Sequence, residues 1–408
     1  MSVVEFAEAL DIVLEHARGF PARTAEQIAL LDAAGRVLAE DVTADRDQPP
    51  FHRSTRDGFA VRATDFTASA QLKIVGQVRA GEAWCSDAMQ PGCAIEIMTG
   101  APMPDGADAV AMIEHVALAD GNVWAAPGRT LRAGENVVPQ GSEARAGEVV
   151  LAAGSVIGAA EIAMSAACGH AELMVRSRPS VTIIATGDEL VELGARLGSQ
   201  QIWNSNGYAL AALVAVAGGR AERSKIARDT REDIRARIAE GRRSDLLLLS
   251  GGVSAGKYDL VEEALAEFGA EFFFTGVKMQ PGRPVVFGRL PGLDGEQATY
   301  FFGLPGNPVS TQVTFHCFVE PLLRAMCGAE PVGPKFVQGT LAEDVSAKAG
   351  LTRVLPTILR HDLERPELRL VSWQGSGDLG ANARANCYAV LPDGEALHAG
   401  DVVTVLLR

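Results

Sequence analysis

Four consecutive leucines at residues 246–249 constrain the fold of this chain more than any other feature of its sequence. A short apolar run without polar alternation is typical of a central strand that is covered on both faces of a sheet. The run ends in a serine and two glycines at residues 250–252, and a helical pattern of apolar residues then extends from Leu260 to a probable C-cap at Gly269. Residues 244–271 therefore predict a strand, a glycine turn and a helix.

The glycine turn is suited to an anion. In open α/β sheets, ligands bind at the carboxyl ends of the strands, where glycine lets the backbone approach and a helix offers free N–H groups. The predicted donors are Ser250, Gly251, Gly252 and Ser254, and Lys257 adds a positive charge. A phosphate is the expected ligand, and the alternative is an ordinary turn that uses glycine only for its conformation.

The design of this turn is repeated between residues 178 and 327, where strand and helix patterns alternate as in a doubly wound α/β sheet. Three further loops, TGDEL, QPGRP and LPGNPVS, follow or flank predicted strands. If the sheet is parallel, all four loops lie at its carboxyl edge and form one oxyanion or phosphate site. The residues predicted to bind there, beyond the first turn, are Thr186, Gly187, Asp188, Pro281, Gly282, Arg283, Pro305, Gly306, Asn307, Pro308 and Ser310.

Three acids near these loops suit a hard cation. Asp188, Glu189 and Asp259 are oxygen donors of the kind that holds Mg²⁺ beside a phosphate. The alternative for Asp188 and Glu189 is an N-cap and a first-turn acid, and for LPGNPVS it is a helix start with Asn307 as N-cap. The sequence contains neither a GxxxxGK[ST] nor a GxGxxG pattern, which excludes a P-loop and a dinucleotide fingerprint.

The remaining segments predict a multidomain α/β protein. Helices are expected at residues 3–18 and 25–38, and the charged, proline-containing segment that follows is expected to be irregular. Short β-like runs predict an inserted β-rich domain and an all-β tail. The predicted domains are an elongated helical and β linker domain at residues 1–48 and 142–177, the β-rich domain at 49–141, the α/β domain at 178–327 and the C-terminal β domain at 328–408.

Composition narrows the function. The net charge of -14 argues against unspecific nucleic-acid binding, because phosphate backbones favour basic surfaces. The six cysteines form no CxxC pair and the seven histidines no HExxH, so neither a zinc site nor a disulfide framework is expected. Acidic residues interrupt the N-terminal apolar pattern, and no apolar run is long enough to span a membrane. We expect a soluble, cytoplasmic protein.

A set of motifs in a fixed order resembles the molybdopterin molybdenumtransferase family, which includes the E domains of plant and animal molybdenum cofactor proteins. The resemblance covers nearly the whole chain. Its motifs are LLDAAGRVLAEDV, QPPFHRSTRDGFAVRATD, IEIMTGAPMPDGADAV, IIATGDEL, SGGVSAGKYD, QPGRPVVFG and GLPGNPVS.

This resemblance implies an elongated four-domain homodimer, with linker domains that dimerise and an active site between the α/β domain of one subunit and the N-terminal domains of the other. It implies Mg²⁺-dependent insertion of molybdate into the dithiolene of adenylylated molybdopterin, with release of AMP. The implied catalytic residues are Asp57, Thr99, Glu143, Glu189, Asp229 and Asp259, and Asn206 and Lys278 join the substrate-binding set. A transient contact with a molybdopterin adenylyltransferase is a further expectation.

The chain departs from the family pattern at several positions. Glu143 stands where an aspartate is usual, Gln280 replaces a frequent lysine, and Gly380 and Ala381 replace common serines. Three alternatives follow: a molybdopterin adenylyltransferase, although relatives of that kind carry TGGTG where this chain has SGGVS; a non-catalytic scaffold of the same fold; and a specialised paralogue that handles tungstate.

Overall fold

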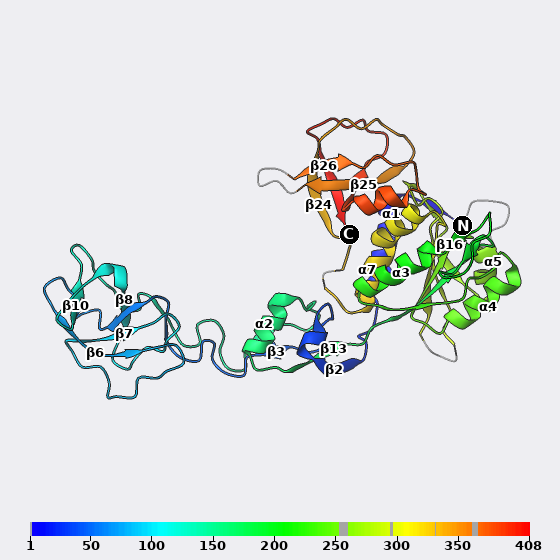
Figure 1. Cartoon of the computed structure of the whole chain (residues 1–408). Helices are drawn as coiled ribbons and strands as arrows, with labels where there is room; N and C mark the ends of the chain where they lie inside the picture. Colours follow the sequence, from blue (N-terminus) through cyan, green and yellow to red (C-terminus); the bar gives the residue numbers. More distant parts are fainter. Residues whose placement is uncertain (1, 253–259, 294–296, 331, 361–365) are drawn as a thin grey trace.

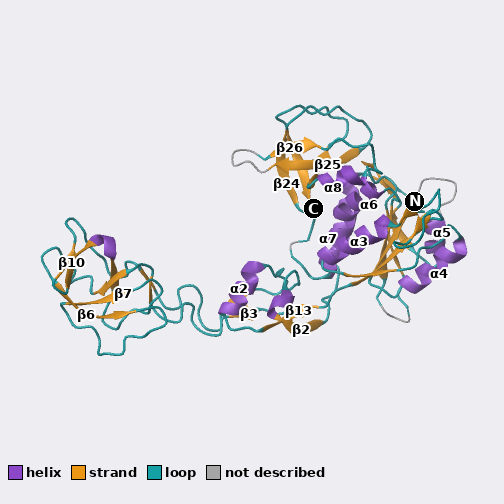
Figure 2. Ribbon diagram, viewed as in Figure 1, coloured by secondary structure: helices purple, strands orange, loops and turns teal. Residues whose placement is uncertain are grey.

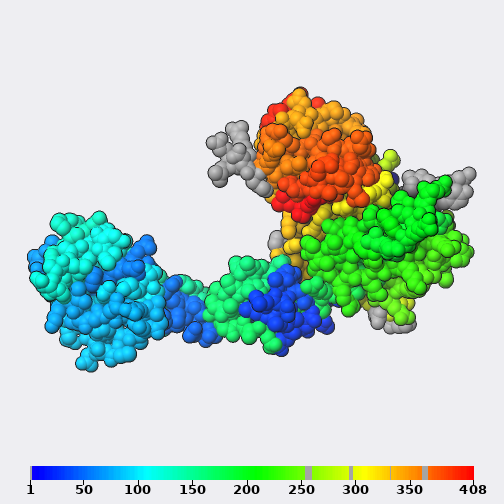
Figure 3. All heavy atoms as spheres, in the orientation of Figure 1, coloured from blue at the N-terminus to red at the C-terminus, as the bar shows by residue number. Residues whose placement is uncertain are grey.

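The computed structural model describes residues 2–252, 260–293, 297–330, 332–360 and 366–408. The chain forms a body of two packed domains and a long arm of two smaller ones (Figure 1). The space-filling view in Figure 3 shows the arm leaving the body as two lobes in a row. Within the described residues, no helix combines the length and the apolar character needed to cross a bilayer.

A six-stranded sheet forms the centre of the body. Strands β17, β14, β18 and β23 run parallel, while β22 is antiparallel to both of its neighbours, β23 and β19. The predicted leucine strand is confirmed as β18, in the middle of the sheet, with all four leucines fully buried. The strands in sheet order are β17 (Arg220–Arg223), β14 (Ser180–Ala185), β18 (Leu246–Ser250), β23 (Thr299–Leu304), β22 (Val286–Leu290) and β19 (Glu271–Phe274).

Helices cover both faces of this sheet, as predicted for a doubly wound domain (Figure 2). One core cluster lies between the sheet and α4 and α5, and a larger one lies on the opposite face. A π-helical turn, Phe315–Val319, separates α6 from α7. The helices are α1 (Phe6–Ala17), α3 (Ser205–Val216), α4 (Arg231–Gly241), α5 (Leu260–Glu267), α6 (Pro308–Thr314) and α7 (Glu320–Met326).

The predicted N-terminal helix is α1, and it packs in the larger core of the α/β domain. Strand β1 (Val3–Val4) pairs in parallel with β20 (Gly276–Val277), which fixes the start of the chain to the body. Residues 1–48 are predicted as part of the linker domain, but only some of them lie there. Strand β1 and helix α1 lie on the body, and the arm begins after α1.

The arm contains a linker domain and a β-rich domain. The helix predicted at residues 25–38 is wrong, because residues 25–29 form strand β2, which pairs along its length with β13, and only a 3-10 turn, Leu30–Ala33, follows. Tertiary pairing has overridden local helix preference there. The linker elements are β2 (Ala25–Ala29), β3 (Val42–Thr43), β12 (Val149–Leu151), α2 (Ala159–Ala167) and β13 (Glu172–Arg176).

The β-rich domain at the end of the arm is a six-stranded sheet in the order β8-β5-β7-β6-β10-β9. One of its central strands, β5, lies in the segment that we expected to be irregular. Its strands are β5 (Gly58–Val61), β6 (Leu72–Val78), β7 (Cys93–Ile97), β8 (Ala109–Met112), β9 (Val116–Ala119) and β10 (Asn122–Ala125). The short pair β4 (Arg53–Ser54) and β11 (Val137–Val138) stands beside it.

The C-terminal domain is a closed β-barrel, because β25 pairs with both β26 and β27. Strand β21 (Met279–Gln280) of the α/β domain extends the barrel at β25, so the two domains share a sheet as well as a core cluster. The elements of the barrel domain are β24 (Phe336–Leu341), β25 (Thr352–Arg360), β26 (Glu367–Leu370), α8 (Leu379–Arg384), β27 (Cys387–Leu391) and β28 (Val402–Leu407).

Candidate active site

A cavity of about 1090 Å³ lies at the carboxyl edge of the parallel strands. All four predicted loops contribute to it. This holds although the sheet is mixed: the antiparallel strand β22 begins at the edge where β23 ends, with Val286 opposite Gly303, so the QPGRP loop before β22 lies at the same edge as the other three. The predicted residues that line the cavity are Thr186, Gly187, Glu189, Asn206, Asp229, Ser250, Gly251, Gly252, Pro305, Gly306, Asn307 and Pro308.

Asn206, near the start of α3, ties two of these loops to each other and to α6. Its side-chain amide donates hydrogen bonds to Ser250 Oγ at 3.0 Å, to the Gly306 carbonyl at 2.8 Å and to Thr311 Oγ1 at 3.2 Å. It can do so because Asn204, rather than Asn206, caps α3 by accepting a bond from the N–H of Gly207. The amide therefore fixes the spacing of the loops that form the cavity.

The glycine turn after β18 requires glycine. Gly251 and Gly252 have φ angles of +95° and +68°, and a Cβ at Gly251 would lie 2.6 Å from the Thr186 carbonyl oxygen. The close approach brings the turn against Thr186, whose hydroxyl is buried and has no hydrogen-bond partner within the described residues. The backbone N–H groups of Gly252, Gly306 and Asn307 also donate no hydrogen bond within that part of the chain. These donors are the ones a bound anion would use.

Acidic groups gather on the side of the cavity formed by Glu189 and Asp229. No helix begins at Asp188 or Glu189, so the N-cap alternative for them is wrong. Thr230 caps α4, which leaves Asp229 free to face the cavity. Although Asp229 is exposed as a residue, partial burial of its carboxyl group raises the pKa, and the nearby charges of Asp188 and Glu189 add to the shift. The N–H of Asp229 donates to Asp188 Oδ1 at 3.3 Å.

The cavity also has an apolar wall that the sequence did not single out. Leu190, Trp203, Ile234, Leu260 and Leu379 line it. Leu379 and Gly377 come from the barrel domain, and the N–H of Val309 donates to the Ser376 carbonyl at 3.0 Å, which holds this segment over the LPGNP loop. The barrel domain thus completes the cavity. Trp203 could have been found from its position directly before the helix cap.

The QPGRP loop meets the cavity only through Pro284. Pro281 and Gly282 are buried, Arg283 is exposed, and none of the three lines the cavity; nor do Asp188 and Ser310. Lys278 forms an ion pair with Glu5 at 2.5 Å, which raises its pKa and occupies its charge.

Arg353, a residue that sequence reasoning missed, lies beside this loop. It is opposite Gln280 in the shared sheet and is 7% exposed. Its Nε and Nη2 atoms are buried without a hydrogen-bond partner in the described part of the chain, and burial lowers the pKa of the guanidinium. A charged residue directly before the apolar residues 354–356 of β25 is the signal that could have found it.

Three predicted catalytic residues lie on the arm, away from this cavity. Asp57 Oδ1 accepts hydrogen bonds from the N–H and the hydroxyl of Thr99, at 2.7 and 2.8 Å, and these bonds lower the pKa of Asp57. Both residues are exposed on the β-rich domain. Glu143 pairs with Arg53 at 2.9 Å. Within one chain the structure does not bring these residues to the cavity (Figure 1).

Ser254, Lys257 and Asp259 lie outside the described residues. Within the described residues, no group of three or more histidine, cysteine, aspartate or glutamate side chains could hold a metal. The predicted Mg²⁺ ligands Asp188, Glu189 and Asp259 therefore remain a prediction.

The domains match known sequence families in the order that the fold displays. Residues 182–325 match a probable molybdopterin-binding domain, which defines the class: proteins built on a molybdopterin-binding α/β domain. Residues 4–169 match the MoeA N-terminal region, described as domains I and II, and residues 338–407 match the MoeA C-terminal region, described as domain IV.

Known relatives extend the match to nearly the whole chain. A molybdopterin molybdenumtransferase of Staphylococcus aureus strain COL is 33% identical over 98% of this chain and 94% of its own length. A second, from Staphylococcus epidermidis strain ATCC 12228, is 31% identical over 93% and 90%. The crystal structure of a molybdopterin biosynthesis MoeA protein from Pyrococcus horikoshii OT3 superposes with a TM-score of 0.78, at 28% identity and full coverage of both chains. The chain belongs to the molybdopterin molybdenumtransferase family, as its motifs indicated.

Proposed function

We propose that this protein inserts molybdate into adenylylated molybdopterin and releases AMP. The observation that carries the proposal is the buried hydroxyl of Thr186, which has no partner among the described residues, beside the Gly251-Gly252 turn in a cavity shaped by four loops. A buried donor without a partner costs stability, and a bound phosphate or oxyanion would satisfy it.

The cavity offers the two surfaces that such a substrate needs. The free N–H groups of Gly252, Gly306 and Asn307 suit the phosphate, and the apolar wall around Trp203 suits a flat heteroaromatic ring. Nε and Nη2 of Arg353, which have no hydrogen-bond partner among the described residues, lie next to the QPGRP loop and support an additional oxyanion contact. The dithiolene supplies the nucleophilic sulfurs, so the protein chiefly positions the reactants and neutralises charge.

Mg²⁺ fits the acidic side of this cavity. Magnesium usually takes one or two carboxylates, and substrate phosphates and water complete its coordination. Glu189 and Asp229 line the cavity, and Asp188 lies beside Asp229, so carboxylates stand near the place proposed for the phosphate. When bound, the ion would screen the phosphate charge. The ligands that we propose for it come from Asp188, Glu189 and Asp259: Glu189 lines the cavity, Asp188 lies beside Asp229, and Asp259 is outside the described residues, so one or two of the three would bind the ion directly.

The proposed enzyme is a homodimer in which the arm of one subunit reaches the cavity of the other. Exposed Asp57 and Thr99 support this arrangement, because this hydrogen-bonded pair lies on the β-rich domain at the far end of the arm and does not line the cavity of its own chain. We also propose a cytoplasmic location and a transient contact with the adenylyltransferase that would supply the substrate.

The direct test is to incubate the purified protein with adenylylated molybdopterin, Mg²⁺ and molybdate. We expect AMP release that depends on the oxyanion, and formation of cofactor that activates a molybdoenzyme apoprotein. An absence of AMP release at every molybdate and tungstate concentration would contradict the enzyme and favour the scaffold. A preference for tungstate would identify the specialised paralogue.

The adenylyltransferase alternative predicts a different reaction. Such an enzyme would form pyrophosphate from ATP and molybdopterin, which the same preparation can be tested for directly. Matches to molybdenumtransferases over 93% to 98% of the chain, including the arm and the barrel, favour the transferase.

A further inference from the structure

The arm joins the body through two chain segments that lie side by side. Residues 18–24 lead into the arm and residues 177–179 lead out of it, and strands β2 and β13 continue both segments as an antiparallel pair. Thr24 and Ser177 bond to each other through their side chains at 2.9 Å, and the Ser177 N–H donates to the Thr24 carbonyl at 2.8 Å. The two segments therefore move as one unit.

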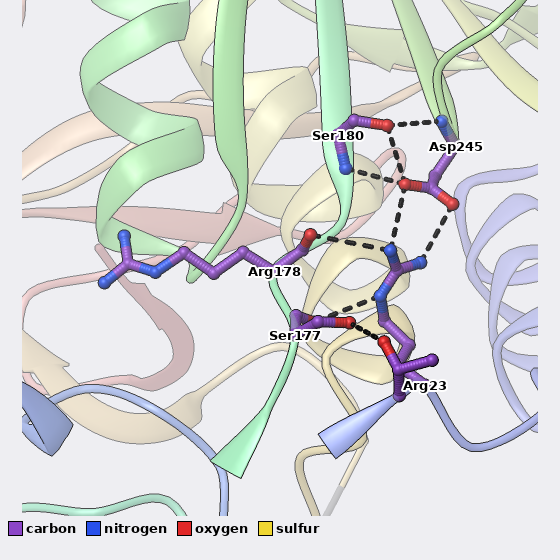
Figure 4. Close-up of polar contacts among 6 residues, drawn as sticks. Arg23, Ser177, Arg178, Ser180 and Asp245 are labelled. Carbon is purple, nitrogen blue, oxygen red and sulfur yellow. Dashed lines mark hydrogen bonds and ion pairs between the residues drawn. The ribbon is translucent and has the colours of Figure 1, made fainter. Parts of the chain in front are cut away.

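Asp245 anchors this unit to the body (Figure 4). Its carboxylate accepts two bonds from the Arg23 guanidinium, at 2.8 and 3.2 Å, and two from the N–H and hydroxyl of Ser180, both at 2.7 Å. Arg23 also donates to the Ser177 carbonyl at 3.0 Å, so one guanidinium connects both arm segments to one carboxylate. A bidentate arginine–carboxylate pair fixes orientation as well as distance.

The same two strands that carry this anchor also carry the site. Asp245 directly precedes β18, and Ser180 begins β14; at their other ends these strands lead into Ser250 and Thr186, which line the cavity. The centre of β18 is fully buried, so the strand is held on both faces and cannot shift alone. The anchor thus connects the arm, at its angle to the body, with the strands that shape the cavity.

Close packing alone does not fix that angle. A second cavity, of about 510 Å³, lies at the junction and is lined by Phe20, Arg23, Asp245 and Tyr300 among others. A small apolar cluster of Val37, Val156, Cys327 and Ala329 also joins arm and body. A backbone hydrogen bond from the Glu330 N–H to the Gly154 carbonyl, at 3.3 Å, also joins arm and body. The contacts of Arg23 and Asp245 are shorter and form a bidentate ion pair, which makes them the strongest directional contact described at the junction.

We propose that Arg23 and Asp245 are positioning residues for the reaction, because they hold the arm at the angle at which Asp57 and Thr99 reach the cavity of the partner subunit. This inference rests on the proposed function for its catalytic consequence. A small rotation at the junction becomes a large displacement at the end of the arm, and displacements of about 1 Å can lower rates by about a hundredfold.

The test uses the full-length protein with Arg23→Gln, Asp245→Asn and the double variant. We expect kcat for AMP release to fall at least about tenfold in each single variant, while the Kd of AMP changes less than about twofold. The Kd is followed by intrinsic tryptophan fluorescence, to which Trp203 in the cavity contributes the ligand-sensitive signal. Asp57→Asn, measured in the same assay, gives the decrease in kcat that is expected when the arm does not contribute to the reaction. Arg369→Gln, which removes the surface pair with Glu367 in the barrel, is the matched control and should leave both quantities unchanged.

Small-angle X-ray scattering supplies a readout that does not depend on turnover. We expect the radius of gyration to change, and the distance distribution to broaden, in the variants but not in Arg369→Gln. The double variant should resemble the single ones, because the two residues act as one pair. Scattering that is identical to the wild type, or a loss of AMP affinity equal to the loss of kcat, would overturn the inference. If the wild type itself lacks turnover, the proposed function fails, and scattering still decides whether this pair sets the arm.

Discussion

At the scale of single residues, Thr186 illustrates a conflict between binding and stability. Its hydroxyl is buried without a partner in the described part of the protein, although the neighbouring strands are fully bonded. We expect Thr186→Val, which keeps the shape and removes the hydroxyl, to raise the stability by about 1 kcal/mol and to weaken AMP binding about tenfold. Calorimetric Tm and a fluorescence titration measure the two effects.

The matched control for this substitution is Thr311→Val. The Thr311 hydroxyl donates to the Pro305 carbonyl at 2.6 Å and accepts from Asn206, so its removal should lower the Tm. Stabilisation by both substitutions would show that methyl burial, and not relief of an unsatisfied hydroxyl, is responsible. An unchanged AMP affinity in Thr186→Val would remove Thr186 from the binding set.

Asp245 gives a pH dependence whose sign follows from its contacts. Burial alone would raise the pKa of its carboxyl group, but the hydrogen bonds from Arg23 and Ser180 outweigh burial and lower it. A lowered pKa in the folded state stabilises the protein above the unfolded pKa of about 3.9, and this contribution is lost as the pH falls through the folded value. We expect Asp245→Asn to cost about 2 kcal/mol at pH 7 and progressively less below about pH 4.

Calorimetry of the wild type and Asp245→Asn from pH 7 down to pH 3 checks this expectation. The difference in Tm should narrow at the acidic end. A difference that stays constant over the whole range would mean that the carboxylate charge contributes nothing and that the substitution acts only through shape.

At the scale of elements, the strand-to-loop turns decide whether the cavity forms. Gly251 combines a positive φ with a Cβ position that would lie 2.6 Å from the Thr186 carbonyl, so Gly251→Ala introduces both backbone strain and a clash. We expect a loss of about 3 kcal/mol and a loss of AMP binding. The control is Gly194→Ala, at φ +89° in open space, which isolates the backbone term and should cost about 1 kcal/mol. Equal Tm losses would contradict the steric argument.

The sequence predicted the elements that depend on local patterns. The leucine strand, α1 and the glycine turn each follow from a few neighbouring residues, and the alternation of strands and helices is enough to indicate the doubly wound sheet. Residues 25–29 were predicted as helix because their pairing partner, β13, lies far along the chain.

The same limit applies to the site. Asn206, at the start of α3, and Gly251, in the turn after β18, carry a local signature, whereas the apolar wall does not. Leu379 reaches the cavity only because the barrel domain packs over the LPGNP loop, and the unpartnered state of Arg353 follows from its burial in a strand shared by two domains. Contacts between residues far apart in the chain are not visible in a local sequence pattern.

At the scale of the whole molecule, the separation of arm and cavity predicts that two subunits share each site. Asp57→Ala disables the arm and Asn206→Ala disables the cavity, and neither homodimer should be active. When the two variants are unfolded and refolded together, random pairing gives heterodimers with one intact site, so we expect about a quarter of the wild-type activity to return.

The contrary outcome is equally clear. If each site belongs to one chain, every mixed dimer carries a defect in both of its sites and no activity returns. Refolded wild type alone is the reference for recovery. A mixture of Asp57→Ala with Thr99→Ala, two changes on the same arm surface, is the control that should remain inactive under either arrangement.

The pairing of Ala25 with Arg176 brings together two points that are 151 residues apart in the chain. The arm is thus an insertion whose two ends lie next to each other at the body. If the arm were deleted, a short turn could join the two chain ends, because they are already adjacent. A foreign domain could be inserted at the same place without changing the path of the chain in the body. This geometry explains how one scaffold can gain an arm of a different length while its cavity stays intact.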